Sequence, residues 1–386
     1  MRLKGLIFLQ VLFCATVFAQ EEEQASYLKS HFELDGYVKF MQTFSGDLDG
    51  NIYDQSLWHN RINTKYTINN NHDISLEFRN RIMYGEAVKL NTSLGSVLGL
   101  DNGIMDLSFV AGENDKFLYS GIIDRFYYKG VSGNWEWSIG RQRINWGINT
   151  FFNANDLFNA FNLTDFDYEE RPGSDAMRIQ KYFKNGSDLE LAGAIYSDTS
   201  IVAALKYGWN FKNYDFQVLA GKYYEDYVIG GGWAGSIKNW GFKGEFSYFI
   251  PDSKENKQAA SLSVSGEYIL KNGKFLSVGA LYSANGLRGG SDVTTSLLSF
   301  QTSAKNLMPT QWTGMVTIGG QLKELSNFAI VLLYMPEVKM GMVMPSITYS
   351  MAQNWDISLY MINIAGVIDG DAIAFANGFF RMKYSF

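Results

Sequence analysis

Segments of about ten residues that are apolar on one parity and polar on the other recur from residue 35 to the end of the chain. Between Asp73 and Tyr84, even-numbered positions such as Leu76 are mostly apolar, and odd-numbered positions such as Arg79 are mostly polar or charged. The segments 240–250 and 262–270 follow the same pattern. Alternation of this length is typical of β-strands with lipid on one face and water on the other. We therefore predict an all-β fold, a transmembrane antiparallel up-and-down barrel.

Other architectures fit the sequence less well. A soluble β-sandwich also alternates, but its strands are shorter and its outward face is polar. After the first nineteen residues there is no apolar run of about eighteen residues, which argues against membrane-spanning helices. The chain has only 5 Pro and no linker-like stretch, so one continuous domain is expected, and its 16% aromatic content suits interfacial girdles.

The alternating runs number eighteen at face value, and because weak runs can be loops we expect sixteen strands within a range of 14 to 18. The turn signals Asn185-Gly186 and Asn272-Gly273 separate neighbouring runs. The number must be even if both termini are periplasmic. Besides the three segments above, runs begin near Asp35, Leu57, Ile122, Trp135, Ala176, Leu189, Ile201, Tyr214, Val228, Phe275, Trp312, Phe328, Met342, Trp355 and Ala372.

The N-terminus has the composition of a secretory signal. Arg2 and Lys4 precede an apolar run over residues 5–18, and Ala19 is the small residue required before a cleavage site. We expect removal of this segment and export through the general secretory pathway. The predicted division is a signal peptide at 1–19, a short periplasmic segment at 20–33 and the barrel at 34–386.

Cys14 is the only cysteine, and it lies within the predicted signal peptide. A lipoprotein is the alternative, but Phe13 stands where a lipobox needs a small residue. Cleavage after Ala19 would leave no disulfide, no thiolate chemistry and no Cys-ligated metal. It would also leave 31 of the 33 basic residues against 39 acidic ones, a net charge of −8, so no nucleic-acid partner is expected.

The last residues alternate strictly and end on an aromatic side chain. Phe380, Met382, Tyr384 and Phe386 are apolar, and the residues between them are polar. This resembles the terminal strand that the outer-membrane assembly machinery recognises. The expected location is the Gram-negative outer membrane, with its lipid, its lipopolysaccharide and that machinery as partners.

The segment from Gly140 to Gly147 departs from the alternation before it. Arg141 and Arg143 share the parity of Ile139, which would place two guanidinium groups in hydrocarbon at a cost of about 2 to 4 kcal/mol each near the midplane. A β-bulge at Gly140 would avoid this cost by shifting the register. With that shift, Arg141, Arg143 and Asn145 face the lumen, and Ile144 and Trp146 face lipid.

Two motifs flank an acidic stretch here: Gly-Arg-Gln-x-x-x-Trp-Gly at 140–147 and Arg-Pro-Gly-x-Asp-Ala at 171–176. Over residues 124–182 the chain resembles porin-like outer-membrane proteins of Gram-negative, Bacteroidota-type bacteria. In those proteins the segment commonly folds inward, here after residue 146, and narrows the pore. The resemblance places Arg141, Gln142, Arg143, Arg171, Asp175 and Arg178 at or near a constriction.

The positions of basic residues along the predicted strands indicate which of these charges face the lumen. A basic wall opposite an acidic loop would create a transverse field that orients dipolar or charged solutes. The alternative is that these charges pair with each other to satisfy a loop buried in the barrel. The basic residues on lumen parities are Arg79, Arg81, Arg125, Arg141, Arg143 and Arg178, and the acidic residues are Asp165, Asp167, Glu169 and Glu170.

Candidates for catalysis or metal binding are few. The histidines His31, His59 and His72 have no spacing that suggests a zinc site, and no calcium-loop pattern is present. We expect no catalytic site, no metal and no cofactor. The leading hypothesis is a passive channel for small solutes, including charged ones. The alternative is a structural or accessory subunit of a larger outer-membrane transport or assembly complex, with a plugged lumen and a protein partner.

Overall fold

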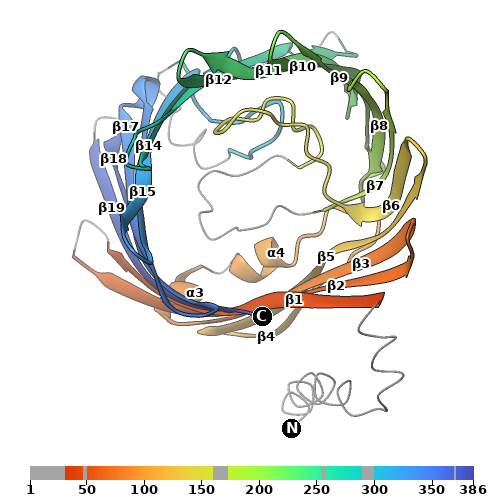
Figure 1. Ribbon diagram of the computed structural model, residues 1–386. Coiled ribbons are helices and arrows are strands. Elements are labelled where there is room, and N and C mark those ends of the chain that lie inside the picture. Colours follow the sequence, from red (N-terminus) through yellow and green to blue (C-terminus); the bar gives the residue numbers. More distant parts are fainter. Residues whose placement is uncertain are drawn as a thin grey trace, which may run out of the picture.

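The computed structural model describes residues 31–46, 50–91, 93–159, 173–253, 257–288, 300–368 and 371–386. Its strands form one antiparallel sheet that closes on itself into an 18-strand barrel (Figure 1). The predicted all-β barrel is confirmed, and the strand number lies at the upper limit of the predicted range. The barrel strands are β1 (Phe32–Gly46), β2 (Ile52–Asn69), β3 (His72–Tyr84), β5 (Phe117–Ser132), β6 (Trp135–Gln142), β7 (Ser174–Tyr182), β8 (Asp188–Ile195), β9 (Ile201–Phe211), β10 (Tyr214–Tyr223), β11 (Asp226–Ile237), β12 (Trp240–Pro251), β13 (Ala259–Ile269), β14 (Phe275–Ser283), β15 (Trp312–Lys323), β16 (Ser326–Met335), β17 (Met340–Ala352), β18 (Trp355–Ile368) and β19 (Asp371–Ser385).

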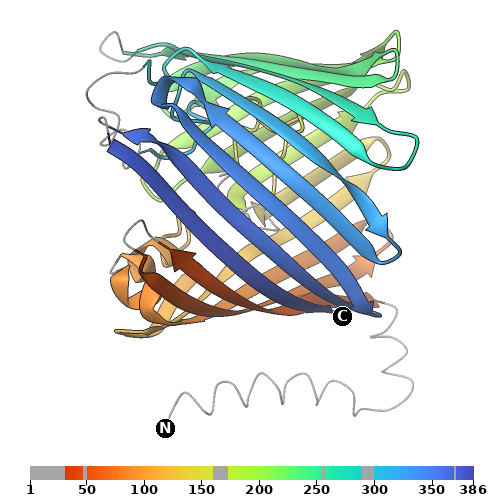
Figure 2. The same ribbon diagram turned by 90° about the vertical axis from the view of Figure 1, so that its left-hand side faces the viewer.

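The barrel closes between its first and last strands. β1 pairs with both β2 and β19, and Tyr37 lies opposite Ser385 in the closing ladder. Backbone hydrogen bonds of 3.0 Å join Gly36 and Phe386 in both directions. The start of β1 and the C-terminus therefore lie at the same end of the barrel (Figure 2).

The two ends of the barrel differ in loop length. Connections at the end that holds the termini are short, including the predicted Asn-Gly turns, where Gly186 and Gly273 adopt positive φ angles of 82° and 77°. The long connections that follow β3, β6 and β14 all leave the wall at the opposite end. In outer-membrane barrels the short turns are periplasmic and the long loops extracellular. We call the two ends the turn end and the loop end.

The outer face is apolar and the inner face is polar along the strands that the sequence predicted best. On β12, Phe246 is 43% exposed on the outside, whereas Glu245 and Ser247 are at most 1% exposed. Aromatic pairs such as Trp240 with Tyr268, 5.2 Å between ring centroids, lie near the turn end, as expected for an interfacial girdle.

Helices are short within the described residues. α3 (Glu86–Leu90) and α4 (Leu94–Leu98) have five residues each, and the 3-10 helix η1 (Pro336–Val338) has three. No helix in the described part of the chain is long and apolar enough to cross a membrane.

Candidate functional site: the barrel lumen

The chain leaves the wall after Gln142 and runs inside the barrel through residues 143–159, which we call the inward segment (Figure 1). It holds to the wall through Glu190 of β8, which is fully buried. The Glu190 carboxylate accepts hydrogen bonds from Trp146 Nε1 at 2.7 Å and from Arg178 Nε at 2.5 Å, and Lys206 Nζ lies 3.0 Å away. Two cations thus neutralise the buried carboxylate while it holds the indole.

A second buried carboxylate, Glu245 of β12, holds the middle of the inward segment. Its oxygens accept the backbone N–H groups of Ile148, Asn149 and Asn155, the last at 2.8 Å. A segment without ladder partners must satisfy its N–H groups in another way, and a carboxylate with several acceptor sites does so. Three wall side chains donate to backbone carbonyls of the inward segment, each at 2.7 Å: Gln217 to Trp146, Ser247 to Ala154 and Ser263 to Phe152.

The prediction that Ile144 and Trp146 face lipid is wrong. They are 0% and 1% exposed, inside the barrel. They belong to a buried apolar cluster that also contains Ala192 and Ala204 of the inner wall. These small wall residues leave room for the indole and the isoleucine inside the barrel. Because both side chains already lie in the lumen, the inward segment starts at residue 143 and not, as predicted, after residue 146.

The predicted bulge at Gly140 is also absent. Both ladders of β6 keep their register through Gly140, which has a φ of 119°. A Cβ there would lie 2.3 Å from the carbonyl oxygen of Phe126, so glycine is required. Without a register shift, Arg141 keeps the parity of Ile139, which is 55% exposed on the outer face.

Arg141 is therefore buried at the level of the wall, where part of it also lines a lumen cavity. Its side chain is 3% exposed and bonds Asp175 at 2.7 and 2.9 Å and Asp101 at 2.5 Å. Asp175 is likewise part of this buried cluster. The chain avoids the cost of a charge in hydrocarbon by supplying two carboxylates and a covering segment, since a charge left unpaired in the interior is strongly destabilising.

Basic side chains gather on the inner face where the barrel closes. Cross-strand register places Lys383, Lys39, His59 and Arg81 in one row across β19, β1, β2 and β3. We call these four residues the basic row. Lys39 and His59 are buried, whereas Arg81 lines a lumen cavity.

Below the basic row, toward the turn end, the charges are paired. Asp124 is the extra residue at a register shift between β3 and β5, and it bonds Arg61 at 2.5 Å and Arg79 at 2.7 Å. Glu77 contacts Arg61 and bonds Arg125 at 3.1 Å. Arg79 and Arg125, two of the predicted pore residues, thus lie in an ion-pair network of the kind that the pairing alternative describes.

The other predicted residues are more scattered. Gln142 is buried, and its amide donates to the carbonyl of Ala176 at 2.9 Å. Arg143 is exposed at the start of the inward segment. Five predicted residues lie outside the described part of the chain: Asp165, Asp167, Glu169, Glu170 and Arg171.

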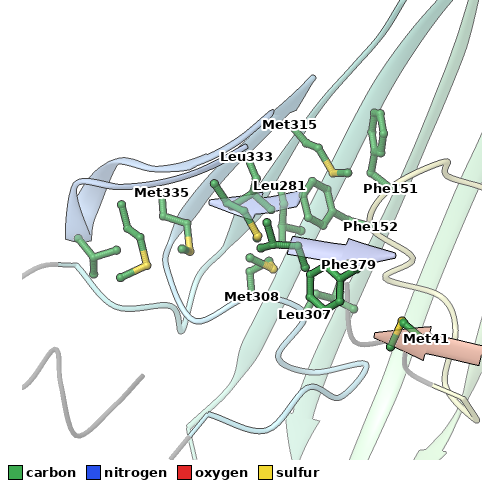
Figure 3. Packing of buried hydrophobic residues seen from close by; sticks show 14 of the residues in the cluster. Met41, Phe151, Phe152, Leu281, Leu307, Met308, Met315, Leu333, Met335 and Phe379 are labelled. Carbon is green, nitrogen blue, oxygen red and sulfur yellow. The ribbon is translucent and has the colours of Figure 1, made fainter. Parts of the chain in front are cut away.

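Sequence reasoning missed an apolar, methionine-rich belt on the inner wall toward the loop end. Two residues along each strand from the basic row, on the side of the loop end, apolar side chains lie opposite one another on neighbouring strands of the barrel. These are Met41, Leu57, Met83 and Leu118. The belt continues over β14 to β19, where the inward segment packs Phe151 and Phe152 on it (Figure 3). The wall residues of the belt, all at most 9% exposed, are Met41, Leu57, Met83, Leu118, Leu281, Met315, Leu333, Met335, Met340, Met342, Ile362 and Phe379.

The histidines have aromatic neighbours. Tyr37 Oη lies 3.5 Å from His59 Nε2, and Tyr128 Oη lies 2.6 Å from His72 Nδ1. Within the described ranges, no group of three or more His, Cys, Asp or Glu side chains could hold a metal ion.

Comparison with known proteins gives a likeness of fold. Neither a protein-family model nor a curated protein matches the sequence. Solved structures that resemble the chain include OccAB3 of Acinetobacter baumannii, with a TM-score of 0.57 and 10% identity over 92% of this chain and 99% of that one. OpdQ and OccK7 (OpdD) of Pseudomonas aeruginosa have TM-scores of 0.57 and 0.56 at 8% identity, over 92% of this chain and 98% and 99% of theirs. The chain therefore has a porin-like outer-membrane β-barrel fold, which fits an outer-membrane location.

Proposed function

We propose that the protein is an outer-membrane channel for the passive diffusion of small solutes, with a preference for anions. The observation that carries the proposal is the basic row on the inner wall, with Arg81 at the edge of a lumen cavity of about 410 Å³. Fixed positive charge beside a low-dielectric wall raises the local concentration of anions. Neither catalysis nor a cofactor is part of this proposal.

The inward segment would act as the constriction. It is fastened to the wall by Glu190 and Glu245, so it occupies lumen space at a fixed place. The resemblance to Bacteroidota-type porin-like proteins implies that Arg143 and Arg171 lie at or near this constriction. Together with the acidic side chains of Asp165, Asp167, Glu169 and Glu170, they would set the local field. A fixed obstacle limits solute size without closing the barrel.

Export and assembly are further parts of the proposal. Residues 1–19 would direct secretion, and the strand that ends at Phe386 would be recognised by the barrel assembly machinery. The mature barrel would then lie among outer-membrane lipid and lipopolysaccharide. The register between β19 and β1 supports this role, since the terminal strand is the one that closes the barrel.

A plugged barrel that serves a larger complex is the second candidate. Its support is the amount of chain docked inside the lumen: besides the inward segment, residues 300–311 contribute the fully buried Ala304 and Thr310, and Lys305 bonds Asp226 at 2.6 Å. A purified, folded barrel that gives no conductance in a planar bilayer and co-purifies with other proteins would favour this candidate.

The deciding experiment is a reversal-potential measurement on purified protein in a planar bilayer under a salt gradient. We expect anion preference in the parent protein and a shift toward cations in Arg81→Gln/Lys383→Gln, because two charges of the basic row are removed. Lys65→Gln is the matched control, since Lys65 lies 3.9 Å from Glu33 in a half-exposed pair near the turn end. An unchanged reversal potential in the double variant would refute the selectivity proposal.

A further inference from the structure

The barrel wall has a gap between β5 and β8 toward the loop end. β6 has only eight residues, fewer than the 9 to 11 of a typical membrane-crossing strand, because the chain turns inward after Gln142. Strand β4 (Ser108–Asn114) fills part of the gap by pairing with the free edge of β5, with Val110 opposite Ser120. Residues 101–107, which we call the wall panel, cover the rest.

The wall panel joins the neighbouring strands at its two ends. Ser197 N donates to the carbonyl of Asn102, and Ile123 N donates to the carbonyl of Leu107, each at 3.0 Å. Gly103 forms an isolated bridge with Tyr196. The panel is therefore fastened to β5 on one side and to the end of β8 on the other.

Between these ends the panel depends on side chains for its backbone hydrogen bonds. Asp101 accepts the N–H groups of Gly103 at 2.9 Å and Leu107 at 2.8 Å. Arg141 donates to the carbonyl of Met105 at 2.6 Å, and its guanidinium joins Asp101 to Asp175. Within a bilayer an unsatisfied backbone group costs several kcal/mol. The ion-pair cluster of Arg141, Asp101 and Asp175, which we call the pin, therefore holds the panel in the wall.

The pin separates two cavities. On the lumen side lies the cavity of about 410 Å³, with Arg79, Arg81 and Tyr196 among its lining residues. On the outer side lies a groove of about 540 Å³. Asp101 and Gly103 line the inner cavity, Ile104 and Met105 line the outer groove, and Arg141 lines both, so the panel is one residue layer thick.

The outer groove has the chemistry of a hydrocarbon-chain site. Apart from the pin, its lining is aliphatic and aromatic, with Leu107, Phe126, Ile139 and Met177 among the residues. The side chains of Ile104 and Met105 are 58% and 55% exposed on the panel surface. The groove opens on the face that lies in the bilayer, so an acyl chain is the occupant that its surroundings supply.

We propose that the wall panel is a lateral portal, through which a solute with a hydrocarbon chain passes between the bilayer and the lumen cavity. The chain would seat in the outer groove, and opening would require release of Asp101 from Arg141. This route is separate from the axial path of ions and polar solutes.

The test places a reporter behind the panel. In a Cys14→Ser background, Thr302→Cys puts a thiol on the lining of the lumen cavity. Proteoliposomes are treated either with a pyrene maleimide dissolved in the bilayer or with a water-soluble sulfonate thiol reagent. We expect Asp101→Ala to speed labelling from the bilayer about tenfold or more, which corresponds to 1.4 kcal/mol less panel-closing free energy. Asp101→Asn, which keeps an acceptor for the panel N–H groups, should give a smaller gain.

Glu136→Gln is the matched control, because Glu136 forms a 2.9 Å ion pair with Lys129 between the same strands, β5 and β6, but near the turn end and away from the panel. It should leave both labelling rates unchanged. Each variant is first checked for a folded barrel by its mobility in unheated detergent gels. If a folded Asp101→Ala barrel is labelled from the bilayer no faster than the parent, the portal is refuted. If both reagents are accelerated equally, the change has widened the axial path and the portal is likewise refuted. Neither result bears on the reversal-potential test of the channel.

Discussion

Removal of the Glu245 carboxylate should free the middle of the inward segment from the wall. Glu245→Ala leaves three backbone N–H groups, those of Ile148, Asn149 and Asn155, without their acceptor. A buried donor left unsatisfied costs about 1 to 3 kcal/mol, and partial replacement by water makes a total of about 3 to 5 kcal/mol reasonable. Because 1.4 kcal/mol is tenfold in an equilibrium constant, the population of the released state should rise by a factor of roughly 10² to several times 10³.

The assay combines single-channel recording with proteolysis. If the inward segment narrows the lumen, Glu245→Ala should give larger and noisier conductance steps, and trypsin should cut faster after Arg143. Glu245→Gln, which keeps one carbonyl acceptor, should show about half of the loss in free energy. Asp215→Asn serves as the control on the nearby strand β10, since Asp215 is exposed and bonds Asn210 rather than the inward segment. Parent-like conductance and cleavage in a folded Glu245→Ala barrel would refute the docking account.

Three further predictions concern the other polar contacts. Glu190→Gln and Trp146→Phe should not be additive in unfolding free energy: the coupling from a double-mutant cycle should be about 1.5 to 3 kcal/mol, and zero coupling would contradict the 2.7 Å bond. Asp124→Asn should lower the free energy of unfolding by about 3 to 5 kcal/mol in urea titrations, because it leaves two buried arginines facing an uncharged amide. A loss below 1 kcal/mol would mean that water already solvates the network. In the loop 196–200, hydrogen bonds from Ser200 hold the pKa of Asp198 below its ordinary value, so Ser200→Ala should raise that pKa in an NMR titration. The stabilisation from Asp198 is present above the unfolded pKa and is lost as pH falls through the depressed folded pKa, and an unchanged pKa in the variant would refute this assignment.

The barrel could be predicted because its signal is local. In a strand between lipid and water, apolar and polar residues alternate along the sequence. The predicted segment 240–250 therefore agrees with β12 to within one residue at its C-terminal end. The Asn-Gly turns at Gly186 and Gly273 and the closing strand β19 follow from equally short-range rules. None of these features needs knowledge of what lies across the lumen.

The lumen could be predicted only in part because its contacts are long-range. The cost of a charge facing lipid predicts that Arg141 faces the lumen. One of its two carboxylate partners, Asp101, lies 40 residues away in a loop with no recognisable pattern. The alternating pattern predicts that Trp146 faces lipid, but it does not apply past Gln142, where the chain has already left the wall. Its pocket comes from small residues such as Ala192 on strands far along the chain.

The methionine-rich belt could not be predicted from the sequence for a related reason. The rule that a lumen is polar holds where water fills it, and it fails where inward segments cover the wall. Met335 and Met342 then pack against other apolar groups as they would in a soluble core. Only the fold of the inward segments reveals which part of the wall is covered.

The central claim is that alternate residues of each strand face hydrocarbon while their neighbours face the lumen. It is tested most directly with nitroxide labels placed one at a time along β12 in lipid vesicles, with collision rates measured for oxygen and for a water-soluble nickel chelate. Labels at Phe242, Phe246 and Tyr248 should collide often with oxygen and rarely with the nickel chelate, whereas labels at Lys243 and Ser247 should show much lower oxygen access. A profile without a period of two residues, or nickel access at Phe246 equal to that of a water-exposed turn, would contradict the account.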